Sequence, residues 1–405
     1  LFILLVFLKN FNILFFNLIF LFFLFFKKNF LFNFMFFNIS MYLVILVFMS
    51  IMILGLIILS ELNFNLKFLS ILLIFVSLMF FFSSNLFFLY FMFEVSLFPI
   101  LIMILGYGYQ IEKINSSYYL FFFTILCSMP FFFFIFNLDL NKNFYFLNYF
   151  FSWEMELILS LMFMVKFPIY FFHFWLPKAH VEAPTTASML LAGLLLKLGS
   201  GGFLRLLFSL NFSFLGLYLL ISFLGMIISN FNCLLQSDLK SLSAFSSINH
   251  MSLVLLLLVL LNSLSIKNSV IIMVSHGFIS TLMFYFIGEF YHLSLTRLIF
   301  YYSSIFLNSL MFCLIISLTW LFNSGVPFSI SFFSEFISLI MIFNFNFFFF
   351  FFMFLYFFLT FYYSLYYIVI NFVGKELINL NYNLIVYSLF FLIINCNIFI
   401  FFIFI

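Results

Sequence analysis

The stretch KFPIYFFHFWLPKAHVEAPTTASMLLAGLLLKLG, residues 166–199, decides the fold of this chain. Two of its lysines, Lys166 and Lys197, are embedded in apolar sequence, and Pro168 follows the first lysine by two positions. Apolar residues at this density predict membrane-spanning helices, in which a proline breaks the backbone hydrogen-bond ladder. A broken helix survives at membrane depth only where protein or water satisfies the freed backbone groups. The stretch therefore predicts a helix that is broken beside a buried lysine and faces a pathway rather than lipid.

The composition of the whole chain is that of a membrane protein. Of 405 residues, 68% are hydrophobic, 26% aromatic and 6% charged, which is far more apolar surface than a soluble core needs. A net charge of +3, dispersed along the chain, gives no indication of a nucleic-acid partner. The four cysteines stand singly in apolar runs, which indicates packed thiols. The 82 phenylalanines reflect AT-rich codons and point to a small genome such as that of an organelle.

Loops marked by charges, Asn, Gly and Pro divide the chain into about thirteen predicted transmembrane helices, so the expected fold class is an all-α, polytopic membrane protein. Two helices are irregular. The sixth contains Pro168, and the eleventh is interrupted by NSGVP at 323–327, where Gly325 and Pro327 break the ladder. Lys and Arg are nearly even on the two sides, so the loops do not predict an orientation. The predicted spans are 11–26, 41–60, 68–82, 86–106, 117–137, 157–175, 185–208, 213–232, 240–262, 268–290, 308–345, 346–372 and 382–404.

Two acids and two bases fall inside these spans: Glu94, Lys166, Lys197 and Glu335. A charge at a helix centre costs roughly 2.5–3.5 kcal/mol on the insertion scale, so these residues need a compensating role. A structural interpretation pairs Glu94 with Lys166 and Glu335 with Lys197 to hold helices together. A functional interpretation, which we favour, makes them part of a series of protonatable groups on successive helices, as a proton conductor requires.

Two histidines, His250 and His276, also fall within spans. Each can belong to the same relay, or can be a single histidine hydrogen-bonded between helices. His173 and His180 fall near span ends, and we expect them at the membrane interface. No second ligand follows any of these histidines at the spacing that a metal site on a helix needs, so no metal is expected.

The stretch at 166–199 closely resembles the signature of the chain 4 family of antiporter-like, proton-pumping membrane subunits in NADH:ubiquinone oxidoreductase, complex I. Four further stretches agree with this family in the proper order, and the resemblance covers about residues 83–340. They are FEVSLFPI at 93–100, SDLKSLSAFSSINHMS at 237–252, SHGFISTLMFYFIGEFYHLSLTR at 275–297 and GVPFSISFFSEF at 325–336.

The resemblance implies a role for each buried polar residue. Glu94 matches the glutamate that pairs with the lysine of the broken helix, here Lys166. Lys197 matches a bridging lysine, and His250 and His276 match two central histidines. Glu335 matches a terminal acid that exchanges protons. The segment EFYHLSLTR departs from a more usual Tyr-Glu-Arg pattern, so no role is implied for that loop. The implied proton relay is Glu94, Lys166, Lys197, His250, His276 and Glu335.

The family's fold contains two inverted five-helix repeats, each with one broken helix, and the resemblance implies the same organisation here. One N-terminal span of the family is expected to be missing. The expected parts are N-terminal transmembrane helices at 1–66, a first repeat at 67–208 with its broken helix at 157–184, a second repeat at 209–372 with its broken helix at 308–345, and a C-terminal transmembrane helix at 373–405.

The implied function is proton translocation by one subunit of an H⁺-translocating NADH:ubiquinone reductase, as a multi-pass protein of the mitochondrial inner membrane. No cofactor, metal or redox centre is expected on this chain, and NADH, FMN, iron–sulfur clusters and ubiquinone are expected on other subunits. The expected partners are other membrane subunits of complex I, including neighbouring antiporter-like ones, together with lipid and protons. Lysine suits such a relay because it can lose its proton when desolvated, whereas arginine cannot.

Two alternatives stay open. A related bacterial Na⁺ or K⁺/H⁺ antiporter subunit shares the buried glutamates and lysines. The sequence WLPKAHVEAP at 175–184 and the organelle-like composition favour complex I. A structural membrane scaffold would use buried charges only to hold helices together. Removing one charge distinguishes these possibilities, because a scaffold would lose assembly, whereas a pump would assemble and stop translocating protons.

Overall fold

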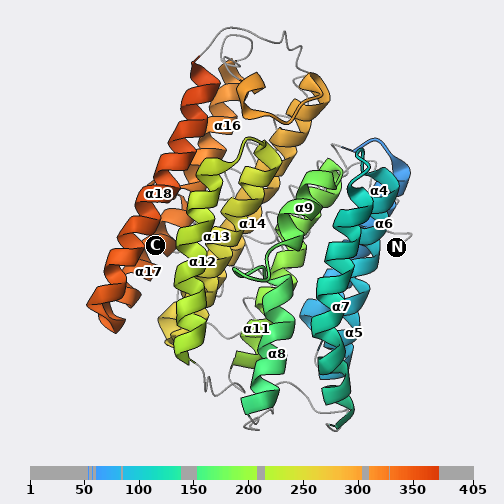
Figure 1. The fold of residues 1–405 in the computed structure, drawn as a ribbon, viewed down its shortest axis with the longest axis vertical. Helices are drawn as coiled ribbons and strands as arrows, with labels where there is room; N and C mark the ends of the chain where they lie inside the picture. Colours follow the sequence, from blue (N-terminus) through green and yellow to red (C-terminus); the bar gives the residue numbers. More distant parts are fainter. Residues whose placement is uncertain are drawn as a thin grey trace, which may run out of the picture.

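A computed structural model describes residues 61–373 apart from 84, 138–152, 208–214, 303–309 and 328, together with Ile53 and Ile57. All of the elements in this part of the chain are helices (Figure 1), and eight helical segments are long and apolar enough to cross a membrane. The all-α, polytopic fold class is therefore confirmed. The predicted spans at 11–26 and 382–404, and all of 41–60 except Ile53 and Ile57, lie outside the described residues, so the number thirteen stays a prediction.

The elements follow one another as α4 (Phe64–Phe82), α5 (Leu86–Val95), α6 (Leu97–Tyr107), α7 (Lys113–Asn137), α8 (Trp153–Lys166), α9 (Trp175–Glu182), α10 (Thr185–Leu190), η4 (Leu191–Leu195), α11 (Leu196–Leu206), α12 (Leu215–Leu235), α13 (Leu239–Val259), α14 (Ser263–Ser294), η6 (Ile299–Tyr302), α16 (Leu310–Asn323), α17 (Ile330–Phe345) and α18 (Phe347–Phe372). Most of them run nearly parallel along the long axis of the molecule (Figure 1).

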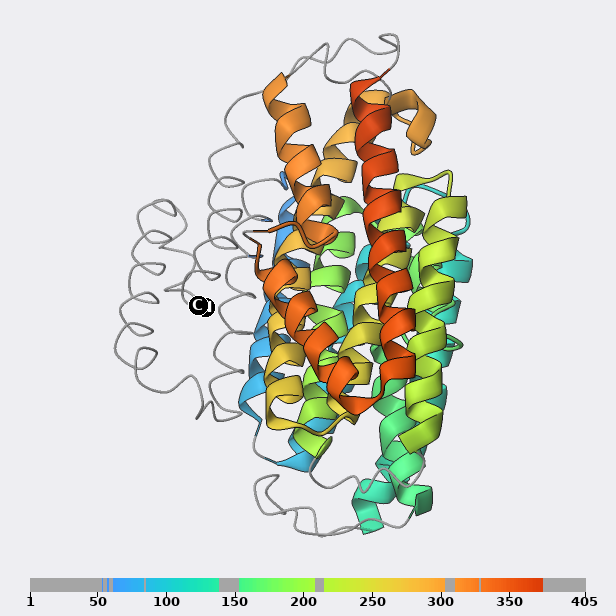
Figure 2. The same cartoon turned by 90° about the vertical axis from the view of Figure 1, so that its left-hand side faces the viewer.

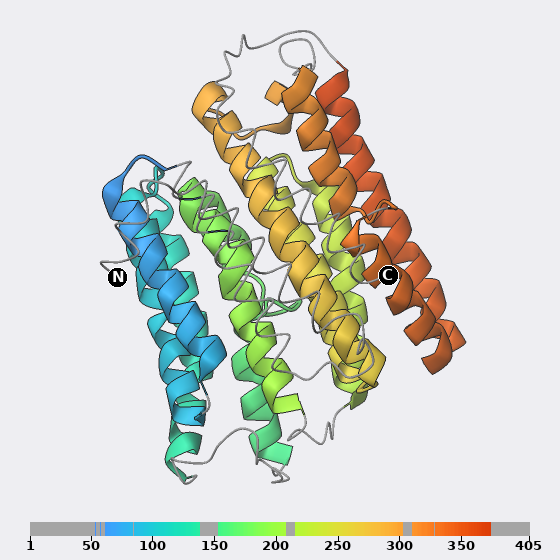
Figure 3. The same ribbon diagram turned by 180° about the vertical axis from the view of Figure 1, so that it is seen from behind.

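The helices form two neighbouring groups, one from α4 to α11 and one from α12 to α18 (Figures 1 and 3). The groups meet where α14 packs against α10 and η4, and where α13 packs against α9. The segment from α10 to α11 and helices α13 and α14 are almost completely buried, whereas less than half of the membrane-spanning part of α4, α7 and α18 is buried. Large apolar side chains on the outer helices suit lipid, so the polar centre of the molecule is enclosed by protein.

The first helix break lies between α8, which ends at Lys166, and α9. Phe171 has a positive φ of 83°, and the indole nitrogen of Trp175 donates to the Val165 carbonyl at 2.9 Å, which satisfies one of the freed backbone groups. A Cβ added at Gly199 on α11 would lie 2.7 Å from the Phe167 backbone nitrogen. Glycine is therefore required there, because α11 passes directly against the break.

The second break lies between α16 and α17, which Figure 2 shows as two helices joined by an irregular segment. Gly325 in this segment has a positive φ of 70°. The Ser331 hydroxyl donates to the Phe322 carbonyl at 2.6 Å, and the Ser329 hydroxyl accepts from the Phe332 backbone nitrogen at 3.2 Å. These serines satisfy backbone groups that the break leaves without helical partners.

Candidate proton-translocation site

Glu94 and Lys166 form an ion pair within the first group of helices. Glu94 Oε1 lies 3.9 Å from Lys166 Nζ, and the exposed fractions of the two side chains are 21% and 1%. The lysine is the last residue of α8, where a cation also interacts favourably with the helix dipole. The pair therefore combines one enclosed cation with one acid that remains partly accessible.

The backbone beside Glu94 is shaped to hold this lysine. Helix α5 ends at Val95, and Pro99 in α6 has no backbone N–H to continue the ladder across the junction. Two residues before the end of α5, the carbonyl of Phe93 accepts hydrogen bonds from the Ser96 hydroxyl and from Lys166 Nζ. The same ammonium lies 3.2 Å from the centroid of the Phe93 ring. The kink between α5 and α6 thus supplies an acceptor for the buried charge as well as its carboxylate partner.

Lys197 follows a π-helical segment, η4, in which the Leu196 backbone nitrogen bonds five residues back to Leu191. Such bulges inside α-helices are frequent at functional sites. Lys197 Nζ donates to the Ala192 carbonyl at 2.5 Å and lies 3.0 Å from Nδ1 of His276 on α14. Lys197 is completely buried, and it reaches no carboxylate within 4.0 Å among the described residues.

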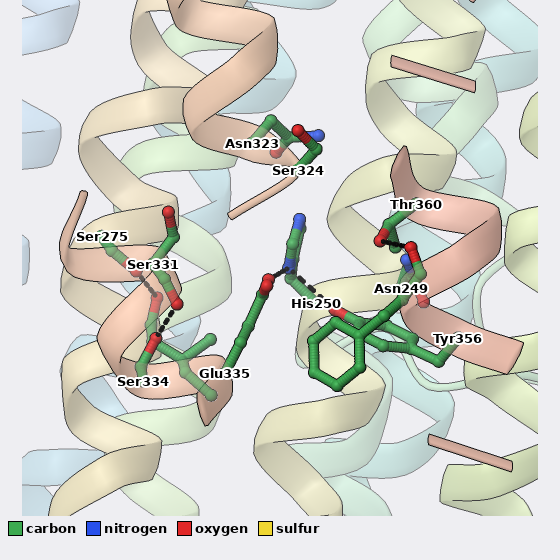
Figure 4. Close-up of polar contacts among 12 residues, drawn as sticks. Asn249, His250, Ser275, Asn323, Ser324, Ser331, Ser334, Glu335, Tyr356 and Thr360 are labelled. Atoms are coloured by element: carbon green, nitrogen blue, oxygen red, sulfur yellow. Dashed lines mark hydrogen bonds and ion pairs between the residues drawn. The ribbon is translucent and has the colours of Figure 1, made fainter. Parts of the chain in front are cut away.

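Contacts continue from His276 to the second group of helices. The His276 ring centroid lies 5.4 Å from that of His250 on α13. His250 Nδ1 in turn lies 4.0 Å from Oε1 of Glu335 on α17, and both of these side chains are buried (Figure 4). A line of buried polar groups therefore runs from Lys197 through both histidines to Glu335.

Glu335 fits against the second helix break. A Cβ added at Gly325 would lie 2.1 Å from Glu335 Oε2, so only glycine leaves room for the carboxylate. The adjacent backbone is held by Asn268 on α14, whose side-chain amide donates to the Ser334 carbonyl at 2.7 Å. The break thus creates the space in which this buried acid lies.

The structure brings the predicted residues together in two sets. Glu94 and Lys166 form the first set, and Lys197, His276, His250 and Glu335 form the second. The structural pairing of Glu335 with Lys197 is wrong, because Glu335 lies beside His250 and no lysine of the described residues is within 4.0 Å of it. Gly199 lies two residues after Lys197 and against the backbone of Lys166 and Phe167, so the break adjoins both sets.

The family described as NADH:quinone oxidoreductase/Mrp antiporter, TM, matches residues 83–360, which include every residue of both sets. The chain is 54% identical over 297 residues to NADH-ubiquinone oxidoreductase chain 4 of Caenorhabditis elegans, a match that covers 73% of each protein. It is 51% identical over 301 residues to the chain 4 protein of Ascaris suum, over 73% of this chain and 72% of the relative. The chain belongs to this family.

Two solved structures share the fold. A chain of respiratory complex I from Thermus thermophilus with bound NADH superposes with a TM-score of 0.81 at 20% identity, over 89% of this chain and 80% of that one. A chain of the Mrp complex from Dietzia sp. DQ12-45-1b gives 0.74 at 14% identity, over 83% and 66%. Complex I and Mrp chains thus have one architecture, and the distinction between them comes from the much higher sequence identity to chain 4.

A second group of buried charges was not predicted from the sequence. Lys240, Glu182 and Arg297 fall at the ends of the predicted spans or between them, and all three side chains are buried. Glu182 Oε1 lies 3.9 Å from Arg297 Nη1, and Lys240 Nζ donates to the Ala183 carbonyl at the end of α9 at 2.8 Å. Their position beside turns gave no signal of burial, because the covering elements come from distant parts of the chain.

His173 and His180 are packed among aromatic side chains, and their place at the membrane interface stays a prediction. His173 stacks between Tyr170 and Phe174, and His180 stacks on Phe284 of α14 with ring centroids 4.4 Å apart. Both histidines are buried within the protein. Among the described residues, no three His, Cys, Asp or Glu side chains lie close enough together to hold a metal ion.

Proposed function

We propose that this chain moves protons within the membrane arm of mitochondrial respiratory complex I through Glu94, Lys166, Lys197, His276, His250 and Glu335. The chain is a proton-translocating subunit of that complex, located in the inner membrane as a multi-pass protein. The observation that carries the proposed relay is the line of neighbouring buried polar side chains from Lys197 to Glu335, which crosses the junction between the two groups of helices.

The Glu94 and Lys166 pair provides the means of control. At an effective dielectric of about 20, an opposite charge about 4 Å away is worth roughly 4 kcal/mol. Withdrawal of Glu94 would therefore favour release of the proton held by Lys166, and its return would favour reloading. We propose that the released proton reaches Lys197 through water admitted at the α8–α9 break, because broken helices at membrane depth line hydrated pathways.

The second set would then carry the proton onward to Glu335. A lysine, two imidazoles and a carboxylic acid can each accept and release a proton, whereas an arginine cannot. We also propose that the two breaks belong to two inverted repeats, at 67–208 and 209–372, because each break lies beside a buried carboxylate or its lysine partner.

The energy for this movement would come from other subunits. Chain 4 relatives are named as parts of NADH-ubiquinone oxidoreductase, and we propose that NADH, FMN, iron–sulfur clusters and ubiquinone bind elsewhere in the complex. An antiporter of the Mrp type has the same fold, but the 54% identity to chain 4 favours complex I. Neighbouring antiporter-like subunits are the expected lateral partners.

Lys197→Met in the assembled complex tests the relay. This substitution leaves no acid unpaired, because Lys197 contacts a histidine and a carbonyl. We expect normal assembly, measured by NADH oxidation with an artificial acceptor, together with loss of most proton pumping in vesicles. Lys67→Met, at the start of α4, is the matched control and should pump normally. Normal pumping by Lys197→Met would remove this residue from the pathway, and loss of assembly would favour a scaffold.

A further inference from the structure

One nitrogen of His250 faces two different partners. Its Nδ1 atom lies 3.3 Å from the hydroxyl of Tyr356 on α18 and 4.0 Å from Oε1 of Glu335 on α17. Figure 4 shows both side chains reaching the same edge of the imidazole ring. The first distance permits a hydrogen bond and the second is too long for one. His250 is therefore bonded to Tyr356 in this structure, and the acid lies next to it without a hydrogen bond to Nδ1.

The partner of Nδ1 determines what the ring can do. A neutral imidazole carries its proton on one nitrogen and accepts with the other. If the Tyr356 hydroxyl donates to Nδ1, the ring proton must be on Nε2, and that nitrogen cannot take a proton from the rest of the relay. If Nδ1 carries the proton and donates to Glu335, Nε2, which Figure 4 shows turned toward Asn323 and Ser324, is free to accept a proton.

We propose that Tyr356 is a positioning residue that gates the last step of the relay, by holding His250 in the tautomer that cannot accept a proton. This inference rests on the relay proposed above. It adds a group that the sequence gives no reason to select, because Tyr356 is one of 21 tyrosines and lies in an aromatic run.

The open arrangement moves one proton without any other bond change. Nε2 accepts a proton, the imidazolium then passes its Nδ1 proton to the Glu335 carboxylate, and the ring is neutral again with its proton on Nε2. Return of the Tyr356 hydroxyl to Nδ1 stabilises this tautomer. The closed arrangement therefore opposes return of the proton from Glu335 to His250, which gives the step a direction.

The three groups come from three different helices, so a small displacement can exchange the partners. His250 lies on α13, Glu335 on α17 and Tyr356 on α18, and α18 packs against both α12 and α17. Tyr356 is completely buried, and its carbonyl accepts from the side chain of Asn230 on α12 at 3.5 Å. Movement of α17 by about one ångström would bring Glu335 Oε1 from 4.0 Å to within hydrogen-bond distance of Nδ1, where it can compete with Tyr356.

Tyr356→Phe tests this gate, because it removes only the hydroxyl. The assembled complex is placed in vesicles and its amount is normalised by NADH oxidation with an artificial acceptor. One neutral hydrogen bond shifts an equilibrium by about 2- to 12-fold, so passive proton conductance without NADH should rise by about that factor. The protons pumped per NADH should fall. Tyr367→Phe on the same helix, whose ring packs 4.5 Å from Trp320, is the matched control and should change neither quantity.

The double variant Tyr356→Phe with Glu335→Gln separates a gate from a packing defect. A leak through the relay needs the Glu335 carboxylate and should disappear, whereas a leak through disturbed packing should persist and would overturn the gate. Unchanged conductance in Tyr356→Phe, with pumping abolished in His250→Gln, would overturn the gate and leave the relay intact. Normal pumping by His250→Gln would overturn both.

Discussion

The two helix breaks hold their acids in different ways. At the first break, Glu94 is partly exposed and pairs with a lysine that is itself bound to the Phe93 carbonyl. At the second break, Glu335 is enclosed, fills the space above Gly325 and lies beside a histidine. A partly exposed acid opposite a fixed cation suits a movable control element. An enclosed acid beside an imidazole suits a group that changes its protonation state.

The two sites also differ in the charge that they hold. The ion pair of Glu94 and Lys166 has two ionised partners, so removing either one leaves an uncompensated charge in a low-dielectric site. Glu335 and His250 can both be neutral without leaving such a charge. Pumping should therefore depend at the first site on whether Lys166 can release its proton, and at the second site on whether Glu335 can exchange one.

Lys166→Arg should have the largest effect. Arginine keeps the positive charge opposite Glu94, so assembly should persist, but its pKa above about 12 prevents it from releasing a proton. We expect quinone-coupled proton pumping to fall at least about tenfold, with NADH oxidation by artificial acceptors retained. Lys178→Arg on α9, where the ammonium lies 3.5 Å from the Tyr119 ring, should pump normally. Near-normal pumping by Lys166→Arg would reduce the first site to a structural bridge.

Glu335→Gln should have the next largest effect, because glutamine keeps the shape and the fit against Gly325 but cannot exchange a proton. Vesicles carrying the variant should show a several-fold loss of proton pumping, because a proton-transfer group has been removed. Glu154→Gln, on the exposed first turn of α8, provides the control for the substitution itself. If the two variants pump equally, Glu335 is not the terminal acid of the relay.

Gly325→Ala should have the smallest effect on chemistry and act mainly on stability. The alanine at position 325 would have to keep a positive φ, which costs about 1–2 kcal/mol. Its Cβ would also clash with the Glu335 carboxylate. The amount of assembled complex and its thermal denaturation temperature should both fall. Gly106→Ala, where a new Cβ has no neighbour within 4 Å, should change neither. An equally stable Gly325→Ala complex would mean that Gly325 does not fix the position of the Glu335 carboxylate.

The sequence alone was sufficient for the fold class, because hydropathy and length predict helices in a bilayer whatever their order in space. It was also sufficient to select Glu94, Lys166, Lys197 and Glu335, since a charge inside an apolar span is costly enough to require a role. The two breaks followed from Pro168, Gly325 and Pro327, because the absence of an N–H or of a Cβ is a local property of the chain.

Only the tertiary structure decided which groups meet. The sequence could not exclude a Lys197 and Glu335 pair, since contact between helices depends on their rotation and depth, and the structure places both histidines between these residues. The burial of Glu182 and Lys240 likewise depends on elements far along the chain. The choice between Tyr356 and Glu335 as the partner of His250 is a matter of tenths of an ångström between three helices, a quantity that no local pattern of residues encodes.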